Sequence, residues 1–258
     1  GGRRPETVEG RRPEPVEGPA TVRIEVNAWE GWRPISPWLY GRNMNLSGRD
    51  KFMWKDQRTL ALEAGLRISR ESDGNNGTKY NWKNDLSSHP DWYNNVYKQG
   101  RVERARTIQD RCPGVVGLFG LPVLGWVAKT GAVNYDERTH DPKAEHRLKN
   151  LCGGGVGTAY CEVQSPRETV DGLDRWFGSG GLGLDPAKFP LWHMDNEPES
   201  WRNTHDDVSG TLMTGEECVM KYVAVAREVK ARYPAIQLMA PGFSSEWFWW
   251  NWSDHNCV

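Results

Sequence analysis

Short apolar runs that alternate with helical patterns are the feature that most restricts the fold of this chain. Buried-strand patterns recur along it, at Trp38–Asn43, Leu66–Arg70, Leu121–Val127, Leu191–Asp195 and Ile236–Ala240. Strands that alternate with helices build parallel sheets, and polar, aromatic-rich segments after several strands are typical of (β/α)8 barrels. The sequence therefore predicts an α/β fold, a partial (β/α)8 TIM barrel of about five β/α units.

Two of the predicted helices have explicit start signals. Ser165–Glu168 and Thr214–Glu217 each match a capping box, in which the first hydroxyl and the glutamate three residues later bond each other's backbone N–H groups. The second of these helices should end before Pro234. A third helix is predicted over Lys51–Glu63 and should stop at Gly65.

A doubly wound open sheet is the competing architecture. No Gly-x-Gly-x-x-Gly motif follows the first strand, and the glycine cluster at 178–183 neither follows a strand nor opens a clear helix. We interpret that cluster as a loop, and nucleotide binding has little support.

Two stretches precede the predicted barrel. Residues 1–20 repeat a unit rich in Arg, Glu, Pro and Gly, which predicts a disordered tail. Residues 21–30 contain a short alternation with Val22, Ile24 and Val26 on one face, which predicts an accessory strand outside the barrel. Residues 31–258 then hold the incomplete barrel.

The charge balance argues against two classes of partner. The chain has 33 Lys and Arg against 34 Asp and Glu, so no basic surface is expected to collect nucleic acid or anionic lipid. No run approaches the ~20 apolar residues that span a bilayer, and residues 1–20 lack the apolar segment of a signal peptide. The 14 Trp residues favour a ligand such as a sugar, which offers both apolar faces and hydrogen-bonding groups.

The cysteines form no paired Cys-x-x-Cys set; they are Cys112, Cys152, Cys161, Cys218 and Cys257. Neither a zinc ribbon nor a dense disulfide scaffold is indicated. Cys152 and Cys161 flank a glycine-rich loop and could form a local disulfide, whereas Cys218 falls in a helical pattern and is expected in the core. His146 could join the first two as a metal ligand, but the irregular spacing makes this the weaker interpretation. We expect no metal and no cofactor.

The strongest local signal is the segment Trp192–Pro198, in which a buried strand ends in Asp-Asn-Glu-Pro. Pro198 forces the chain out of the sheet, so Glu197 should project from the carboxyl-end rim, where barrel enzymes place catalytic groups. Cleavage of a glycoside needs one carboxylic acid and a second carboxylate, and Glu197 fits the acid. A strand-end glutamate in a salt bridge is the alternative.

In its wider context this segment resembles glycoside hydrolase family 44, a family of retaining β-glucan hydrolases. Asp195–Pro198 is followed by Trp201 and by Thr204-His205 at the family's spacing. Further matches occur in the same order at Ile35–Gly41, Tyr80–Trp82 with Asp91–Tyr93, Leu121–Val127 and Pro241–Trp252. The resemblance departs at Asp73–Gly77, where the family tends to have Gly-Gly-Asn, and nothing in Gly153–Gly183 matches.

The resemblance implies an endo-acting hydrolase of β-1,4-linked glucan or xyloglucan that works by a retaining mechanism. It implies that Glu197 is the general acid/base and that Asn196 contacts the sugar at the cleavage subsite. The other candidates for substrate binding are Trp126, Trp201, His205 and Trp247. The accessory strand over residues 21–30 would then belong to a β-sandwich.

The resemblance also places the nucleophile on a seventh strand, beyond residue 258, so the chain is expected to be truncated and inactive. Secretion is the family expectation, and the partner is a polysaccharide or oligosaccharide. The alternatives are a non-catalytic carbohydrate-binding remnant and another barrel glycosidase of the mannanase or xylanase type. Glu71 and Glu246 also lie near strand ends, where salt bridges or hydrogen bonds are the expected roles. The sequence predicts no oligomeric state.

Overall fold

The computed structural model describes residues 24–27, 30–43, 57–71, 73–87, 100–129, 161–205, 208–209 and 211–244. The chain divides into two units, Gly1–Ile35 and Ser36–Val258. In the first unit, residues 24–27 form no strand, and the side chains of Ile24 and Val26 are exposed. The accessory β-sandwich stays a prediction, and the predicted tail lies outside the described residues.

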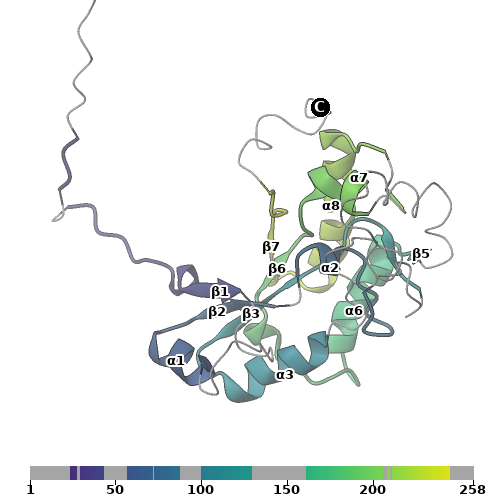
Figure 1. Cartoon of the computed structure of the whole chain (residues 1–258). Helices are drawn as coiled ribbons and strands as arrows, with labels where there is room; N and C mark the ends of the chain where they lie inside the picture. The colour runs from purple at the N-terminus through teal and green to yellow at the C-terminus, as the bar shows by residue number, and fades with distance from the viewer. Residues whose placement is uncertain are drawn as a thin grey trace, which may run out of the picture. The chain divides into compact units, whose positions relative to one another are not determined.

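The second unit contains a five-stranded parallel sheet (Figure 1). Its strands, in spatial order, are β1 (Gly41–Asn43), β2 (Ile68–Arg70), β3 (Val116–Gly120), β6 (Leu191–His193) and β7 (Gln237–Met239). Each strand pairs in parallel with the one before it in this order, as successive β/α units of a barrel do. The α/β class and the parallel sheet are confirmed, and the partial barrel stays a prediction.

The two capping boxes begin α6 (Pro166–Phe177) and α8 (Gly215–Arg232), as predicted. The remaining helices are α1 (Gln57–Glu63), α2 (Asn75–Thr78), α3 (Arg101–Arg111) and α7 (Trp201–Thr204), with 3-10 turns η1 (Pro37–Leu39), η2 (Pro186–Lys188) and η3 (Pro198–Ser200). Helix α1 ends before Gly65, whose φ of 82° is the left-handed conformation that glycine adopts readily. The described part of the chain contains no helix long and apolar enough to span a membrane.

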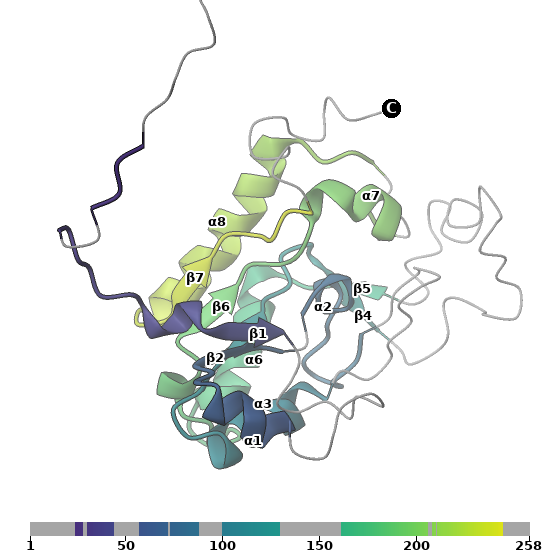
Figure 2. The ribbon, with the colours of Figure 1, turned by 60° about the vertical axis from the view of Figure 1, so that its left-hand side comes forward.

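The main core lies between one face of the sheet and helices α3, α6 and α8, which run along that face (Figure 2). Phe119 from β3 and Trp192 from β6 meet Trp176 of α6 there, with ring centroids 5.0 and 5.2 Å from Trp176. Ile68, Leu118 and Leu191 form a smaller cluster on the opposite face, where an apolar hollow of about 490 Å³ also reaches Arg70.

The third strand is Val116–Gly120 and not Leu121–Val127 as predicted. The apolar run from Val115 to Val127 is longer than one strand, so periodicity alone does not locate the paired residues. Gly117 and Gly120 weaken the strand signal, yet the fold requires them. An added Cβ on Gly117 would lie 2.8 Å from the ring of Phe189. After a turn, Trp126–Ala128 forms β4, which pairs in an antiparallel sense with β5 (Cys161–Val163).

The buried cysteines among the described residues are Cys112, Cys161 and Cys218. Cys218 lies in the core, as predicted. The proposed disulfide and metal partners Cys152 and His146 lie outside the described residues, as does Cys257. Within the described ranges, no group of three or more His, Cys, Asp or Glu side chains could hold a metal ion.

Candidate active site

Glu197 lies just beyond the carboxyl end of β6, where the sequence predicted it. The chain stays beside the segment that follows β7, because Asn196 bridges Gly242 in parallel and the Glu197 N–H donates to the Gly242 carbonyl at 2.7 Å. Pro198 then begins η3 and turns the chain away from the sheet. The half-buried Glu197 side chain is therefore held at the edge of the sheet where parallel strands end.

The backbone on both sides of Asn196 is strained. Among the described residues, positive φ values outside glycine occur at Asp85, Asp195 (69°) and Glu197 (45°). Such conformations cost about 1–3 kcal/mol each and persist where surrounding contacts enforce them. Here the Glu197 carbonyl accepts hydrogen bonds from the N–H and hydroxyl of Ser200, both at 2.9 Å. Strain of this kind clusters at functional sites.

Asp195 holds the strained turn in place. Its buried carboxylate accepts hydrogen bonds from the Thr78 hydroxyl at 2.6 Å and from the N–H groups of Val123 and Asn196 at 2.7 and 2.8 Å. Burial raises the pKa of Asp195 to about 6, against the opposing effect of these hydrogen bonds. The contacts join the end of β6 to α2 and to the turn after β3, so Asp195 has a structural role.

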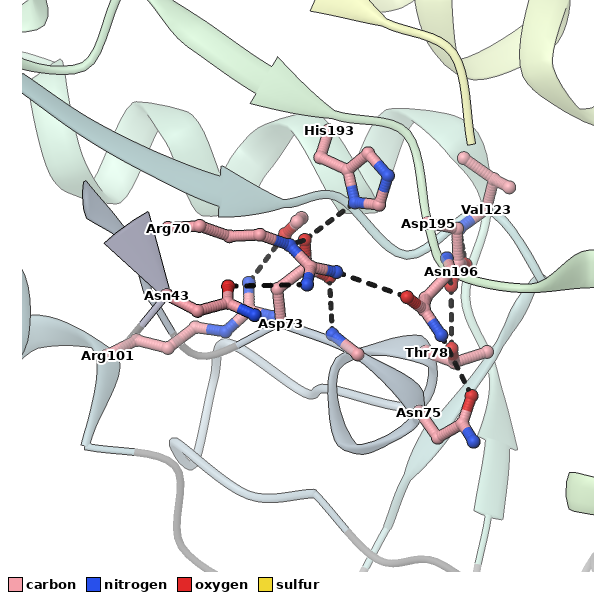
Figure 3. Close-up of polar contacts among 12 residues, drawn as sticks. Asn43, Arg70, Asp73, Asn75, Thr78, Arg101, Val123, His193, Asp195 and Asn196 are labelled. Atoms are coloured by element: carbon pink, nitrogen blue, oxygen red, sulfur yellow. Dashed lines mark hydrogen bonds and ion pairs between the residues drawn. The ribbon is translucent and has the colours of Figure 1, made fainter. Parts of the chain in front are cut away.

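The Asn196 side chain is fixed by two neighbours (Figure 3). Arg70 Nη2 donates to its Oδ1 at 3.1 Å, and its Nδ2 donates to Asn75 Oδ1 at 3.0 Å. Because a guanidinium only donates, Oδ1 must face Arg70, and this contact fixes which way the amide points. An amide held in this way can hydrogen-bond a sugar hydroxyl without adding charge.

Glu197 is in surroundings that favour its protonated form. Burial raises the pKa of Glu197 and so does the negative charge of Glu199, while Arg70 and hydrogen bonds from Asn75 and Asn196 act in the opposite direction. The net effect is a pKa above the ordinary value of a glutamate. Glu199 is itself buried, and one of its oxygens accepts from the N–H and hydroxyl of Ser244, both at 2.7 Å. A raised pKa favours the protonated carboxyl group, which is the form that a general acid needs.

An ion network lies beside Asn196, between the ends of β2 and β6. Asp73 Oδ2 accepts from His193 Nδ1 at 2.6 Å and from Arg70 Nε at 2.9 Å. Burial would raise the pKa of Asp73, but the hydrogen bond and charge of His193, with the charges of Arg70 and Arg101, lower it to about 2. Asp73 is therefore a carboxylate throughout the pH range in which proteins usually work.

This network makes the stability of the protein depend on pH. The pKa of Asp73 is about 2 when folded against an ordinary 3.8, so its contribution is present above pH 3.8 and is lost as pH falls toward 2. The difference corresponds to about 2 kcal/mol. We expect the loss of unfolding free energy on Asp73→Asn to be about 2 kcal/mol smaller at pH 2 than at pH 5, measured by urea denaturation. The same loss at both pH values would contradict the assignment.

The predicted substrate-binding residues do not all lie at this site. Trp201 is 1% exposed and packs in the main core, and His205 is fully buried, so neither presents a surface to a sugar. Trp126 is half-buried, opens β4 and lines a hollow with Met213 and Lys221, whereas the prediction had it near the end of a barrel strand. Trp247 lies outside the described residues, as does Glu246.

The sequence predictions missed Arg70, Asp73, Asn75 and His193. Arg70 and Asp73 stand at the end of a buried strand, as Glu197 does, so the rule that located Glu197 could also have indicated them. His193 lies within β6, and no sequence signal distinguishes it from a core residue. Glu71, which the sequence predicted to have a structural partner, pairs with Arg104 at 3.2 Å and accepts from Ser69 at 2.7 Å.

A half-buried glutamate beyond the carboxyl end of a parallel strand stands where enzymes with such sheets place catalytic groups, and glycoside cleavage needs a carboxylic acid. The chain belongs to glycoside hydrolase family 44, whose model matches residues 75–256. The resemblance found in the sequence is thus confirmed.

Among curated proteins, Endoglucanase A of Paenibacillus lautus is 26% identical over 245 residues, which are 85% of this chain and 32% of that protein. Beta-mannanase/endoglucanase A of Caldicellulosiruptor saccharolyticus is 23% identical over 249 residues, 89% of this chain and 17% of that protein. The chain therefore spans a third or less of the length of these relatives.

Solved structures show the same fold. A family 44 endoglucanase from Clostridium acetobutylium matches with a TM-score of 0.57 at 21% identity, over 88% of this chain and 44% of that one. A Paenibacillus polymyxa xyloglucanase of the same family, solved with xyloglucan, matches with a TM-score of 0.54 at 22% identity, over 82% of this chain and 42% of that one.

Proposed function

We propose that Glu197 is the general acid/base of a retaining hydrolase that cleaves β-1,4-linked glucan or xyloglucan. The observation that carries this proposal is a half-buried glutamate with a raised pKa at the carboxyl end of β6, in a chain of a glycoside hydrolase family. Asn196, oriented by Arg70 and Asn75, hydrogen-bonds a hydroxyl of the sugar next to the cleaved bond.

In this reaction Glu197 gives its proton to the glycosidic oxygen while the bond from that oxygen to the anomeric carbon breaks. A second carboxylate attacks the anomeric carbon and forms a glycosyl ester. Glu197, now ionised, takes a proton from the water that hydrolyses this ester and returns to its starting form. Because Glu197 must first be protonated and later ionised, a pKa above the ordinary value suits both steps.

We propose that the second carboxylate lies outside the described residues. The carboxylates at the strand ends are occupied: Asp73 by Arg70 and His193, Asp195 by Thr78, and Glu71 by Arg104. Glu199 lies only two residues from Glu197, and Ser244 binds one of its oxygens. We therefore propose that this chain by itself binds glucan without appreciable turnover.

Hydrolysis of carboxymethylcellulose and xyloglucan by the chain and by Glu197→Gln tests this proposal. We expect no appreciable release of reducing ends by either protein, because retention of configuration needs two carboxylates about 5–5.5 Å apart. Robust turnover that is lost in Glu197→Gln would show that the chain contains its own nucleophile, with Glu246 the first candidate. Turnover that survives the substitution would overturn the role of Glu197.

The substrate class is tested by affinity. We expect cellotetraose or a xyloglucan oligosaccharide to bind more tightly than mannotetraose or xylotetraose in calorimetric titrations of the chain. A preference for either of the last two would support the mannanase or xylanase alternative. Because such polysaccharides lie outside cells, we also propose that the enzyme is secreted.

A further inference from the structure

Asp73 is a buried carboxylate that the proposed reaction does not use. It follows β2, and its side chain is 3% exposed. Besides Arg70 and His193 on Oδ2, its Oδ1 accepts the N–H of Gly74 at 2.8 Å. The space for it is provided by Gly120 of β3, where an added Cβ would lie 2.4 Å from Oδ1. The fold therefore makes room for a fully hydrogen-bonded charge at the edge of the site.

Arg70 connects this charge to Asn196. Its Nε donates to Asp73 while its Nη2 donates to Asn196 Oδ1 at 3.1 Å, and Nη1 reaches Asn43 at 3.5 Å (Figure 3). The guanidinium is planar, so the Nε bond to Asp73 sets the direction in which Nη2 points. The orientation of Arg70 thus fixes the orientation of the Asn196 side-chain amide.

We propose that Asp73 is a positioning residue for Asn196 and acts through Arg70, with His193 as the second support of the same carboxylate oxygen. The inference deepens the proposed function, since it rests on Asn196 as a sugar contact. Asp73 must be a carboxylate because Gly74, Arg70 and His193 all donate hydrogen bonds to it, and a carboxylate only accepts. An asparagine would present an NH2 group to one of them, so at least one bond would be lost.

The first test is a spectroscopic one on the sugar-free protein. In the native chain the Asn196 side-chain NH2 signals, assigned by their loss in Asn196→Ala, should be well separated and slow to exchange with water. Asp73→Asn should speed that exchange by about tenfold, the factor that the loss of about 1.4 kcal/mol of local protection gives. Asp174→Asn is the matched control, because it weakens an ion pair with Arg232 between α6 and α8. Unchanged Asn196 signals in Asp73→Asn would overturn the inference.

The second test asks whether Asp73 acts through Arg70. Affinity for cellotetraose should fall about tenfold in Asp73→Asn, and Arg70→Gln should weaken it at least as much. The double variant should bind cellotetraose no more weakly than Arg70→Gln alone, because Asp73 affects Asn196 only through Arg70. Additive losses would overturn the route through Arg70. Absence of cellotetraose binding by the native chain would overturn the proposed sugar contact, while the exchange measurement would still judge the positioning.

Discussion

Replacing Trp201 with alanine is expected to lower the free energy of unfolding by about 3–5 kcal/mol. The indole is 1% exposed, packs in the main core and donates its N–H to the Asn196 carbonyl at 2.9 Å. Its removal leaves a cavity and an unpaired carbonyl directly before Glu197, so two separate costs add. Urea denaturation of the two proteins, followed by fluorescence and by far-UV circular dichroism, measures the difference.

Trp201→Phe is the matched control for this prediction. A phenyl ring keeps most of the packing and loses the hydrogen bond, so a smaller cost of about 1–2 kcal/mol is expected. A loss below about 1 kcal/mol for Trp201→Ala, combined with weaker binding of oligosaccharide, would instead support the substrate-binding role for which Trp201 was a candidate.

Gly120→Val is expected to cost about 3 kcal/mol or more, because the new side chain collides with Asp73. An added Cβ at position 120 would lie 2.4 Å from Oδ1 and 2.9 Å from Cγ of that carboxylate. The carboxylate would have to move away from His193 and Arg70, and both side chains would lose their hydrogen bonds to it. Urea denaturation near pH 7, where the carboxylate is charged, measures the cost.

A second background tests whether the cost of Gly120→Val comes from the collision with Asp73. In an Asp73→Gly background the same Gly120→Val change should cost much less, because the opposing carboxylate is gone. An equal cost in both backgrounds would show that Gly120 is required for another reason, such as the strand backbone that carries the bond from Arg101.

The starts of α6 and α8 and the position of Glu197 were predictable because their signals are local. The residues of the capping boxes at Ser165 and Thr214 are three positions apart, and the structure contains both reciprocal bonds. Glu197 stands between a strand and a proline, which fixes its place at the end of β6 whatever the rest of the chain does. Patterns that span only a few neighbouring residues act on the local backbone conformation, so they can be recognised without knowing the tertiary structure.

The ion network was not predictable because it joins residues far apart in the chain. Asp73 meets His193 only because β2 and β6 flank β3, and it fits only because position 120 lacks a side chain. Trp201 shows a second limit. Its distance from the Asn-Glu-Pro motif is the same whether the ring packs inward or faces a cleft, and packing against the core decides between the two. The ends of β3 were not predictable either, because the apolar run around it is longer than the strand and only pairing with β2 and β6 selects the residues.

The most direct test of the account is the pKa of the Glu197 carboxyl, followed by its side-chain carbon chemical shift in NMR titration of this chain, with Glu197→Gln to assign the signal. We expect Glu197 to have a pKa above the ordinary glutamate value, with a further rise when cellotetraose covers the site and a fall in Glu199→Gln, which removes a neighbouring negative charge. A Glu197 pKa at or below the ordinary value, unmoved by the sugar, would contradict its role as the acid that begins glycoside cleavage.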